Sequence, residues 1–190
     1  MDIRQLKQTA KKHFKAQYGM ALLISFLPSI ALTAIGLTGI GLILLLPVQV
    51  GIAFAFMQIN RAEITGVNAL IKGFNPESYL NNVIQLFLMG LFLVLWSFLL
   101  IIPGIIKLYA YALVPYLLAD DDVQDTDAIT LSRRMMKGYK GQLFWLHLTF
   151  IGWFVLGILT FGLLFVLYIN PYLHSVTARF YQEVKKNYQG

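Results

Sequence analysis

The chain has no cysteine and few charged residues. Without cysteine it can form no disulfide framework, no thiolate nucleophile and no cysteine metal site. Charged residues make up 13% of the sequence, about half the share in an ordinary soluble domain. Apolar residues make up 58%, and the mean hydropathy is +0.68. These values exclude an ordinary water-soluble domain and indicate an integral membrane protein.

The sequence also lacks a Ser-His-Asp arrangement, a phosphate-binding loop and an HExxH motif. Its one acidic cluster is DDxxD, formed by Asp121, Asp122 and Asp125, a pattern in which carboxylates hold magnesium bridged to a diphosphate. Enzymes that use this pattern need a second acidic cluster, which this chain lacks. We therefore interpret the aspartates as complementing the dipole of the following helix, with Asp125 or Thr126 as its N-cap. A metal-dependent lipid or prenyl-phosphate enzyme using the three aspartates remains the alternative, and we expect neither enzymatic activity nor a cofactor.

Charged residues are absent from long blocks of the chain. None lies between Lys15 and Arg61 or between Lys140 and Arg179, and only Lys107 lies between Glu77 and Asp120. Each block is too long for one transmembrane helix of about 20 residues and fits two helices joined by a tight turn.

The sequence therefore predicts an all-α, polytopic membrane protein in which six transmembrane helices form three hairpins. The hairpins are expected at about residues 19–59, 80–119 and 142–178 of one integral membrane domain, with turns at 36–41, 102–104 and 157–162.

Amphipathic helices are expected at about residues 2–17, 64–74 and 126–138, lying in the membrane interface beside the hairpins. Every Lys and Arg except Lys107 lies in these segments, beside them or after the last span, and none lies in a hairpin turn. Because positive residues favour the cytoplasmic side, we expect a multi-pass protein of the bacterial cell membrane with both termini in the cytoplasm.

The order of basic helix, span, turn and proline-bearing span recurs along the chain. IKGF at 71–74 matches MKGY at 136–139, and PYL occurs at Pro115 and at Pro171. We interpret this order as an internal triplication.

The basic helices are the first candidate binding site. Lys11, Lys12, Arg133, Arg134 and Lys137 carry positive charge beside predicted spans, where anionic lipid head groups are the nearest partners. For this reason we expect membrane lipids, a protein partner or a second copy of the chain as partners, and no nucleic acid despite the net charge of +6.

Polar residues within the predicted spans form the second candidate. Gln49 and Asn170 lie near prolines, where they could satisfy freed carbonyl groups or line a cavity between broken helices. Lys107 is a functional candidate as an intramembrane charge, although its position near the end of a span favours extension to the outer interface. We interpret His147 and His174 as structural, and the stripe of Ala21, Ser25, Ser29 and Thr33 as close helix packing.

Several longer motifs run in order through the second half of the chain. They are IIPGIIK, VPYLLAD, SRRMMKG, QLFWLHLTFIGW and NPYLHSVTARFYQEV. Together with the opening FKAQYG they resemble the bacterial integral membrane family called domain of unknown function 975. That family is similar in layout to the membrane domain of some glycerophosphodiester phosphodiesterases, which implies a helical membrane architecture and no catalytic residues.

The sequence thus favours a non-enzymatic membrane module that binds lipid or a partner protein, or that helps a small amphipathic molecule to move. A small transporter is a further alternative, and it requires Gln49, Asn170 or Lys107 to lie on a shared polar route.

Overall fold

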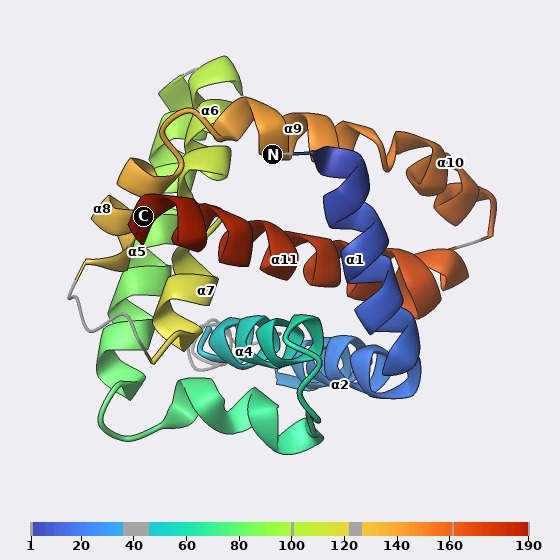
Figure 1. Ribbon diagram of the computed structural model, residues 1–190. Helices are drawn as coiled ribbons and strands as arrows, with labels where there is room; N and C mark the ends of the chain where they lie inside the picture. Colours follow the sequence, from blue (N-terminus) through green and yellow to red (C-terminus); the bar gives the residue numbers. More distant parts are fainter. Residues whose placement is uncertain (1, 36–45, 100, 122–126, 161, 190) are drawn as a thin grey trace.

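The computed structural model describes residues 2–35, 46–99, 101–121, 127–160 and 162–189. Every regular element in these ranges is helical (Figure 1), so the predicted all-α class is confirmed. In chain order the elements are α1 (Ile3–Ala16), α2 (Tyr18–Ile35), α4 (Val48–Asn60), the 3₁₀ helix η1 (Val67–Phe74), α5 (Tyr79–Leu99), α6 (Ile101–Tyr111), α7 (Val114–Ala119), α8 (Ala128–Met135), α9 (Lys140–Leu148), α10 (Ile151–Leu159), the π-helical segment η2 (Phe165–Ile169) and α11 (Asn170–Gln189).

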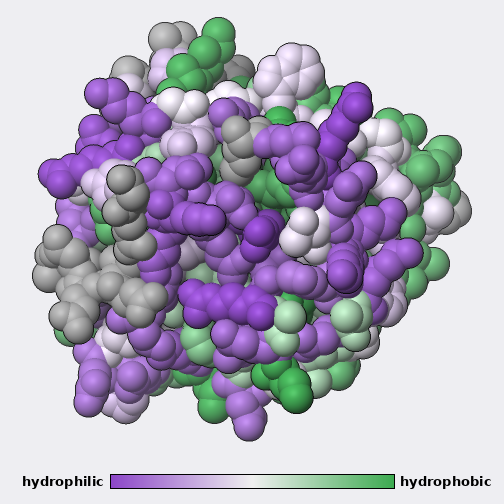
Figure 2. Space-filling view, viewed as in Figure 1, coloured by the Kyte–Doolittle hydropathy of each residue, from purple (hydrophilic) through white to green (hydrophobic). Residues whose placement is uncertain are grey.

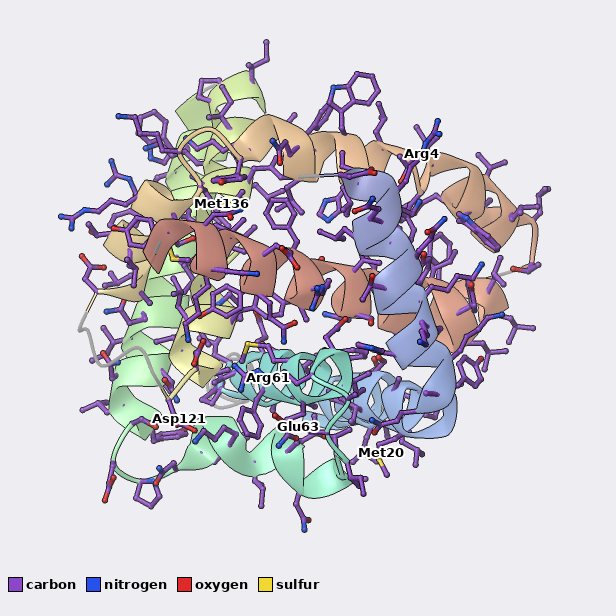
Figure 3. All side chains as sticks on the ribbon, viewed as in Figure 1. Arg4, Met20, Arg61, Glu63, Asp121 and Met136 are labelled. Carbon is purple, nitrogen blue, oxygen red and sulfur yellow. The ribbon has the colours of Figure 1, made fainter. Side chains whose placement is uncertain are left out.

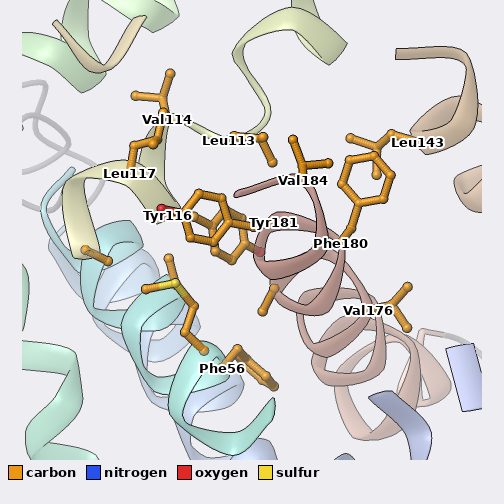
Figure 4. Close-up of a cluster of buried hydrophobic side chains, with 14 of the residues drawn as sticks. Phe56, Leu113, Val114, Tyr116, Leu117, Leu143, Val176, Phe180, Tyr181 and Val184 are labelled. Atoms are coloured by element: carbon orange, nitrogen blue, oxygen red, sulfur yellow. The ribbon is translucent and has the colours of Figure 1, made fainter. Parts of the chain in front are cut away.

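Helices α4 and α11 form the centre of the molecule. Helix α11 packs against α1, α2, α4 and α8, and α4 packs against η1 and α7. Figure 4 shows the buried core around α11, in which Tyr116 of α7 and Tyr181 of α11 lie together on the side of α4 and Phe56, and Phe180 lies on the other side of α11 beside Leu143. The rings of Tyr116 and Tyr181 stack with their centroids 5.8 Å apart. The core therefore joins the first, middle and last parts of the chain.

Three described stretches are long and apolar enough to cross a membrane, at residues 79–97, 102–119 and 140–159. The prediction of six such helices is therefore wrong for the described residues. Two further apolar helical stretches are shorter than these three. They are α4 and Tyr18–Ile30, the part of α2 whose side chains the structure describes. The turn expected at residues 36–41 lies outside the described part of the chain.

The second hairpin turns earlier than predicted. Helices α5 and α6 pack against each other, and Pro103 and Gly104 lie inside the first turn of α6. A proline is tolerated there because the first amide groups of a helix have no intrahelical partner. The predicted turn at residues 102–104 is therefore wrong. The third turn is found near Thr160, which caps α10, and Gly162, whose φ of +86° suits glycine.

The three expected amphipathic helices correspond to α1, η1 and α8, and apolar residues of α1 and α8 are turned toward the protein, whereas Ile71 of η1 is exposed. Leu6, Ala10 and Phe14 of α1 are buried, and α1 packs against α11. In α8, Ala128 and Met135 are buried in the same way. Apolar burial within the fold therefore holds α1 and α8 in place, and the location of the three helices in a membrane interface stays a prediction.

The glycines of the two matching motifs have different roles. A Cβ atom on Gly73 of IKGF would lie 1.9 Å from the carbonyl oxygen of Pro47, so glycine allows η1 to touch α4. Gly138 of MKGY instead has a φ of +89° and open space around its Cα atom. The two motifs therefore meet different local requirements, and their similarity does not reflect one shared backbone structure.

The outer surface is divided between polar and apolar regions. Figure 2 shows hydrophilic residues over α1, α8 and α11 on the viewed face and apolar residues at the edge where α10 lies. Exposed apolar side chains cover α5, α6 and α10, including Leu95, Ile102 and Ile158, which are 54%, 72% and 72% exposed. Exposed apolar side chains in such number are typical of contact with lipid or with another protein.

Candidate functional site

Five basic side chains surround one depression beside α8. Lys107 of α6, Arg133 and Arg134 of α8, Lys137 and Lys140 line a hollow of about 350 Å³ together with Ala110 and Thr130. Helix α8 is fixed there because the Ser132 hydroxyl donates a hydrogen bond of 2.8 Å to the carbonyl oxygen of Ala110. None of the five cations forms an ion pair with a described residue. The depression therefore gathers five positive charges on the described part of the chain.

An aromatic hollow of about 660 Å³ adjoins this depression. The two share Lys107, Thr130 and Arg133. The other lining residues are Gln85, Leu88, Phe92, Trp96, Tyr111, Asp127 and Ile129. We call the combined feature the basic groove. It has a cationic end formed mainly by α8 and an apolar wall formed by α5.

Lys107 joins the two ends of the basic groove. Its Nζ atom lies 4.5 Å from the centroid of the Trp96 ring, a distance that allows a cation–π contact. The lysine thus lies beside the basic helix α8, and its extension to the outer interface stays a prediction. It also lies apart from Gln49 and Asn170, which line a different cavity.

Asp127 is the acidic residue of the basic groove, and its carboxylate is already engaged. It caps α8 by accepting hydrogen bonds from the Thr130 amide at 3.0 Å and from the Thr130 hydroxyl. These bonds hold the pKa of Asp127 below its usual value, and Arg133 contributes in the same direction. The cap of this helix is therefore Asp127, so the prediction of Asp125 or Thr126 is wrong.

The other predicted lipid-binding residues lie elsewhere. Lys11 and Lys12 are exposed on α1, on the side opposite to its buried Leu6, Ala10 and Phe14. They line none of the five described hollows. The predicted basic residues therefore form two separate groups, of which only the one on α8 borders a hollow.

A second cavity, which we call the central cavity, has a volume of about 420 Å³. It brings together the predicted residues Gln49 and Asn170, which are far apart in the sequence. The remaining lining residues are Ser25, Pro28, Ser29, Ile52, Ala53, Ala112, Pro115, Tyr116, His147, Leu173, His174 and Thr177. Helices α2, α4, α7, α9 and α11 all contribute to its wall.

Asn170 is not needed to satisfy the carbonyl that Pro171 frees. A proline leaves the carbonyl four residues before it without its helical donor. For Pro171 this is the carbonyl of Leu167, which accepts a hydrogen bond of 2.6 Å from the Tyr18 hydroxyl. The Asn170 amide therefore remains available to the central cavity. The interpretation that this residue lines a cavity between broken helices requires such an available amide.

Sequence reasoning did not assign the histidines or the small-residue stripe to a site. His147 and His174 line the central cavity, and so do Ser25 and Ser29, whereas Ala21 is packed at the same face of α2. The side chain of Thr33 lies outside the described part. The four-residue spacing of the serines was the available signal, and it does not distinguish a packed face from a cavity wall.

The acidic cluster is described only at Asp121. Its carboxylate accepts a hydrogen bond of 2.6 Å from Lys72, and the two form an exposed ion pair near the end of α7 (Figure 3). Asp122 and Asp125 lie outside the described residues. Within the described ranges, no group of three His, Asp or Glu side chains is placed to hold a metal ion.

The described part of the chain is an all-α protein with three stretches apolar enough to cross a membrane. Residues 98–188 match the model of the family described as Protein of unknown function (DUF975). This match confirms the resemblance over the second half of the chain, which contains all the cations of the basic groove, and the family description gives no activity. No curated protein and no solved structure matches the chain.

Proposed function

We propose that the protein is a non-enzymatic module of the bacterial cell membrane that binds anionic phospholipid in the basic groove. The observation that carries this proposal is the meeting of five cations, none of which forms an ion pair with a described residue, with the aromatic wall of the adjoining hollow. A lipid phosphate would contact Arg133, Arg134 and Lys137, because guanidinium and ammonium groups are the usual phosphate donors in proteins. The acyl chains would lie along Leu88, Phe92 and Trp96.

The arrangement of charges supports a membrane location for this groove. The three apolar stretches would cross or enter the bilayer, with both termini and the basic residues on the cytoplasmic side. Basic pockets between membrane helices on that side are suited to anionic lipid head groups. Acyl chains would cover the exposed apolar faces of α5 and α10. This contact would remove the free-energy cost of exposing these faces to water.

The test is lipid binding by the purified protein in mild detergent, measured by native mass spectrometry with phosphatidylglycerol as the probe. We expect the variant Arg133→Ala/Arg134→Ala/Lys137→Ala to lose binding by at least tenfold, since each cation near a lipid surface contributes about 1 kcal/mol. Phosphatidylethanolamine, which has no net charge, should bind weakly to both proteins.

The control variant is Lys11→Ala/Lys12→Ala/Lys15→Ala, which removes the same charge from exposed positions of α1. It should bind phosphatidylglycerol as the unmodified protein does. An equal loss of binding in both variants would mean that attraction to anionic lipid is spread over the whole basic surface, and the groove would then not be a specific site. Recovery of a second protein with no lipid would favour the alternative of a partner-binding module.

A further inference from the structure

Polar side chains line the central cavity, and one buried polar atom among them has no hydrogen-bond partner in the described part of the chain. The side chains of Gln49, Asn170 and His174 line it, and those of Gln49 and Asn170 are exposed. The buried atom without a partner is Nε2 of His147. Buried polar atoms are nearly always hydrogen-bonded, so the unsatisfied Nε2 atom of His147 at the wall of this cavity indicates that a bound molecule completes it.

Two other polar residues of the cavity wall have hydrogen-bond partners within the fold. The hydroxyls of Ser25 and Thr177 each donate a hydrogen bond to a carbonyl one turn earlier in their own helix. Their bonding requirements are met within the fold. The groups available for recognition are therefore two carboxamides and two imidazoles, which offer both donors and acceptors.

His147 is held in place for this role by its neighbour. Its Nδ1 atom lies 3.3 Å from the Tyr109 hydroxyl, and the two rings are 5.5 Å apart. Nδ1 can accept the tyrosine proton or donate its own, and the tautomer decides whether Nε2 acts as donor or acceptor. In both cases Nε2 remains free to bind a molecule in the cavity.

The chemistry of the wall restricts the class of ligand. Of the described residues that line the cavity, none is Asp, Glu, Lys or Arg, so a charged ligand would lose its hydration without gaining an opposite charge. The remaining wall is apolar, with Ile52, Ala53 and Leu173 among its members. A volume of about 420 Å³ is within the range of cavities that hold small organic molecules.

We infer that the central cavity binds an uncharged amphiphile whose head group carries both hydrogen-bond donors and acceptors, such as a monoacylglycerol. The carboxamides of Gln49 and Asn170 and the Nε2 atom of His147 bind the hydroxyl and ester oxygens. The short apolar chain lies against Ile52 and Leu173. This site is separate from the basic groove, because the two share no lining residue.

The experiment uses a monooctanoylglycerol that carries a photoreactive diazirine in its chain, with the full-length protein in lipid nanodiscs. Cross-linked peptides are identified by mass spectrometry. We expect labelling on α4 and α11 that unlabelled monooctanoylglycerol suppresses. The matching octanoate probe, which is charged, should label these helices at least tenfold less.

The variant Gln49→Leu/Asn170→Leu keeps the approximate volume of both side chains and removes both carboxamides. Labelling of α4 and α11 should fall about tenfold, because two hydrogen bonds contribute roughly this factor. The matched control is Arg133→Ala/Arg134→Ala/Lys137→Ala, which should label as the unmodified protein does even if it no longer binds phosphatidylglycerol. If the double variant does not fold, as judged by its elution and circular dichroism, His147→Phe should lower labelling about threefold.

Three results would overturn the inference. One is labelling spread over the exposed faces of α5 and α10 and insensitive to competition. Another is equal labelling of the central helices by the neutral and the charged probe. The third is unchanged labelling in folded Gln49→Leu/Asn170→Leu or His147→Phe protein. None of these results bears on lipid binding in the basic groove, which is measured separately.

Discussion

At the scale of single residues, the most consequential polar contact is a buried ion pair between α7 and α11. The carboxylate of Asp120, whose side chain is 3% exposed, lies 2.7 Å from the ammonium of Lys185, whose side chain is 13% exposed. The Tyr181 hydroxyl donates a further hydrogen bond of 2.7 Å to the same oxygen atom. Asp120 therefore ties the end of α7 to the central helix at a point from which water is largely excluded.

We predict that Asp120→Ala lowers the free energy of unfolding by about 3–5 kcal/mol, because it removes the carboxylate that lies against the largely buried ammonium of Lys185. The adjacent Asp121→Ala is the matched control. It breaks an ion pair whose carboxylate is 72% exposed, and such surface pairs contribute at most about 1 kcal/mol. Thermal unfolding in mild detergent, followed by circular dichroism, measures both variants, and equal midpoints would contradict this account.

At the scale of elements, the contact between α4 and η1 depends on the absence of two side chains. A Cβ atom on Gly51 would lie 2.1 Å from the carbonyl oxygen of Leu70, and Gly73 meets Pro47 with similar closeness. Because the clashing atoms belong to the backbone, no side-chain rotation can relieve them. The two elements can pack at this distance only with glycine at both positions.

We predict that Gly51→Ala destabilises the protein by about 1–3 kcal/mol, the usual cost of overpacking a well-packed contact. Gly90→Ala in α5 is the control, because its Cβ would meet nothing within 4 Å and alanine is the better helix former. Its unfolding midpoint should stay unchanged or rise. If both variants unfold at the same temperature in detergent, the close approach of η1 to α4 does not contribute to stability.

At the scale of the whole molecule, the distribution of charge predicts an orientation in the membrane. Because the chain has no cysteine, each introduced cysteine is the sole target of a maleimide. Three exposed positions report on both termini and on one hairpin turn. They are Gln8 of α1, Asn187 of α11 and Thr160 after α10.

We predict that Gln8→Cys and Asn187→Cys react with a membrane-impermeant maleimide in inside-out vesicles of the expressing bacterium and are protected in intact spheroplasts. Thr160→Cys should show the reverse pattern, since no basic residue holds this turn in the cytoplasm. Labelling of Asn187→Cys from the outside would reverse the proposed orientation of the C-terminus. The unmodified chain is the background control.

Local features of this protein were predictable because they depend on neighbouring residues. Composition indicated an all-α membrane protein, and the four-residue spacing of Leu6, Ala10 and Phe14 identified the buried face of α1. The place of Pro103 was misjudged because proline ends one helix and begins another equally well. The number of membrane-length helices was overestimated because a long apolar block does not reveal where its helices are interrupted.

The sequence by itself determined the helical class, the apolar character and the positions of the basic segments, since each follows from composition or from a short period. Only the tertiary structure decided which distant side chains meet. Packing of α4, α9 and α11 brings Gln49, His147 and Asn170 around one cavity, and packing of α8 on α6 places Arg133 beside Lys107. Such meetings depend on contacts between segments far apart in the chain, and no local pattern encodes them.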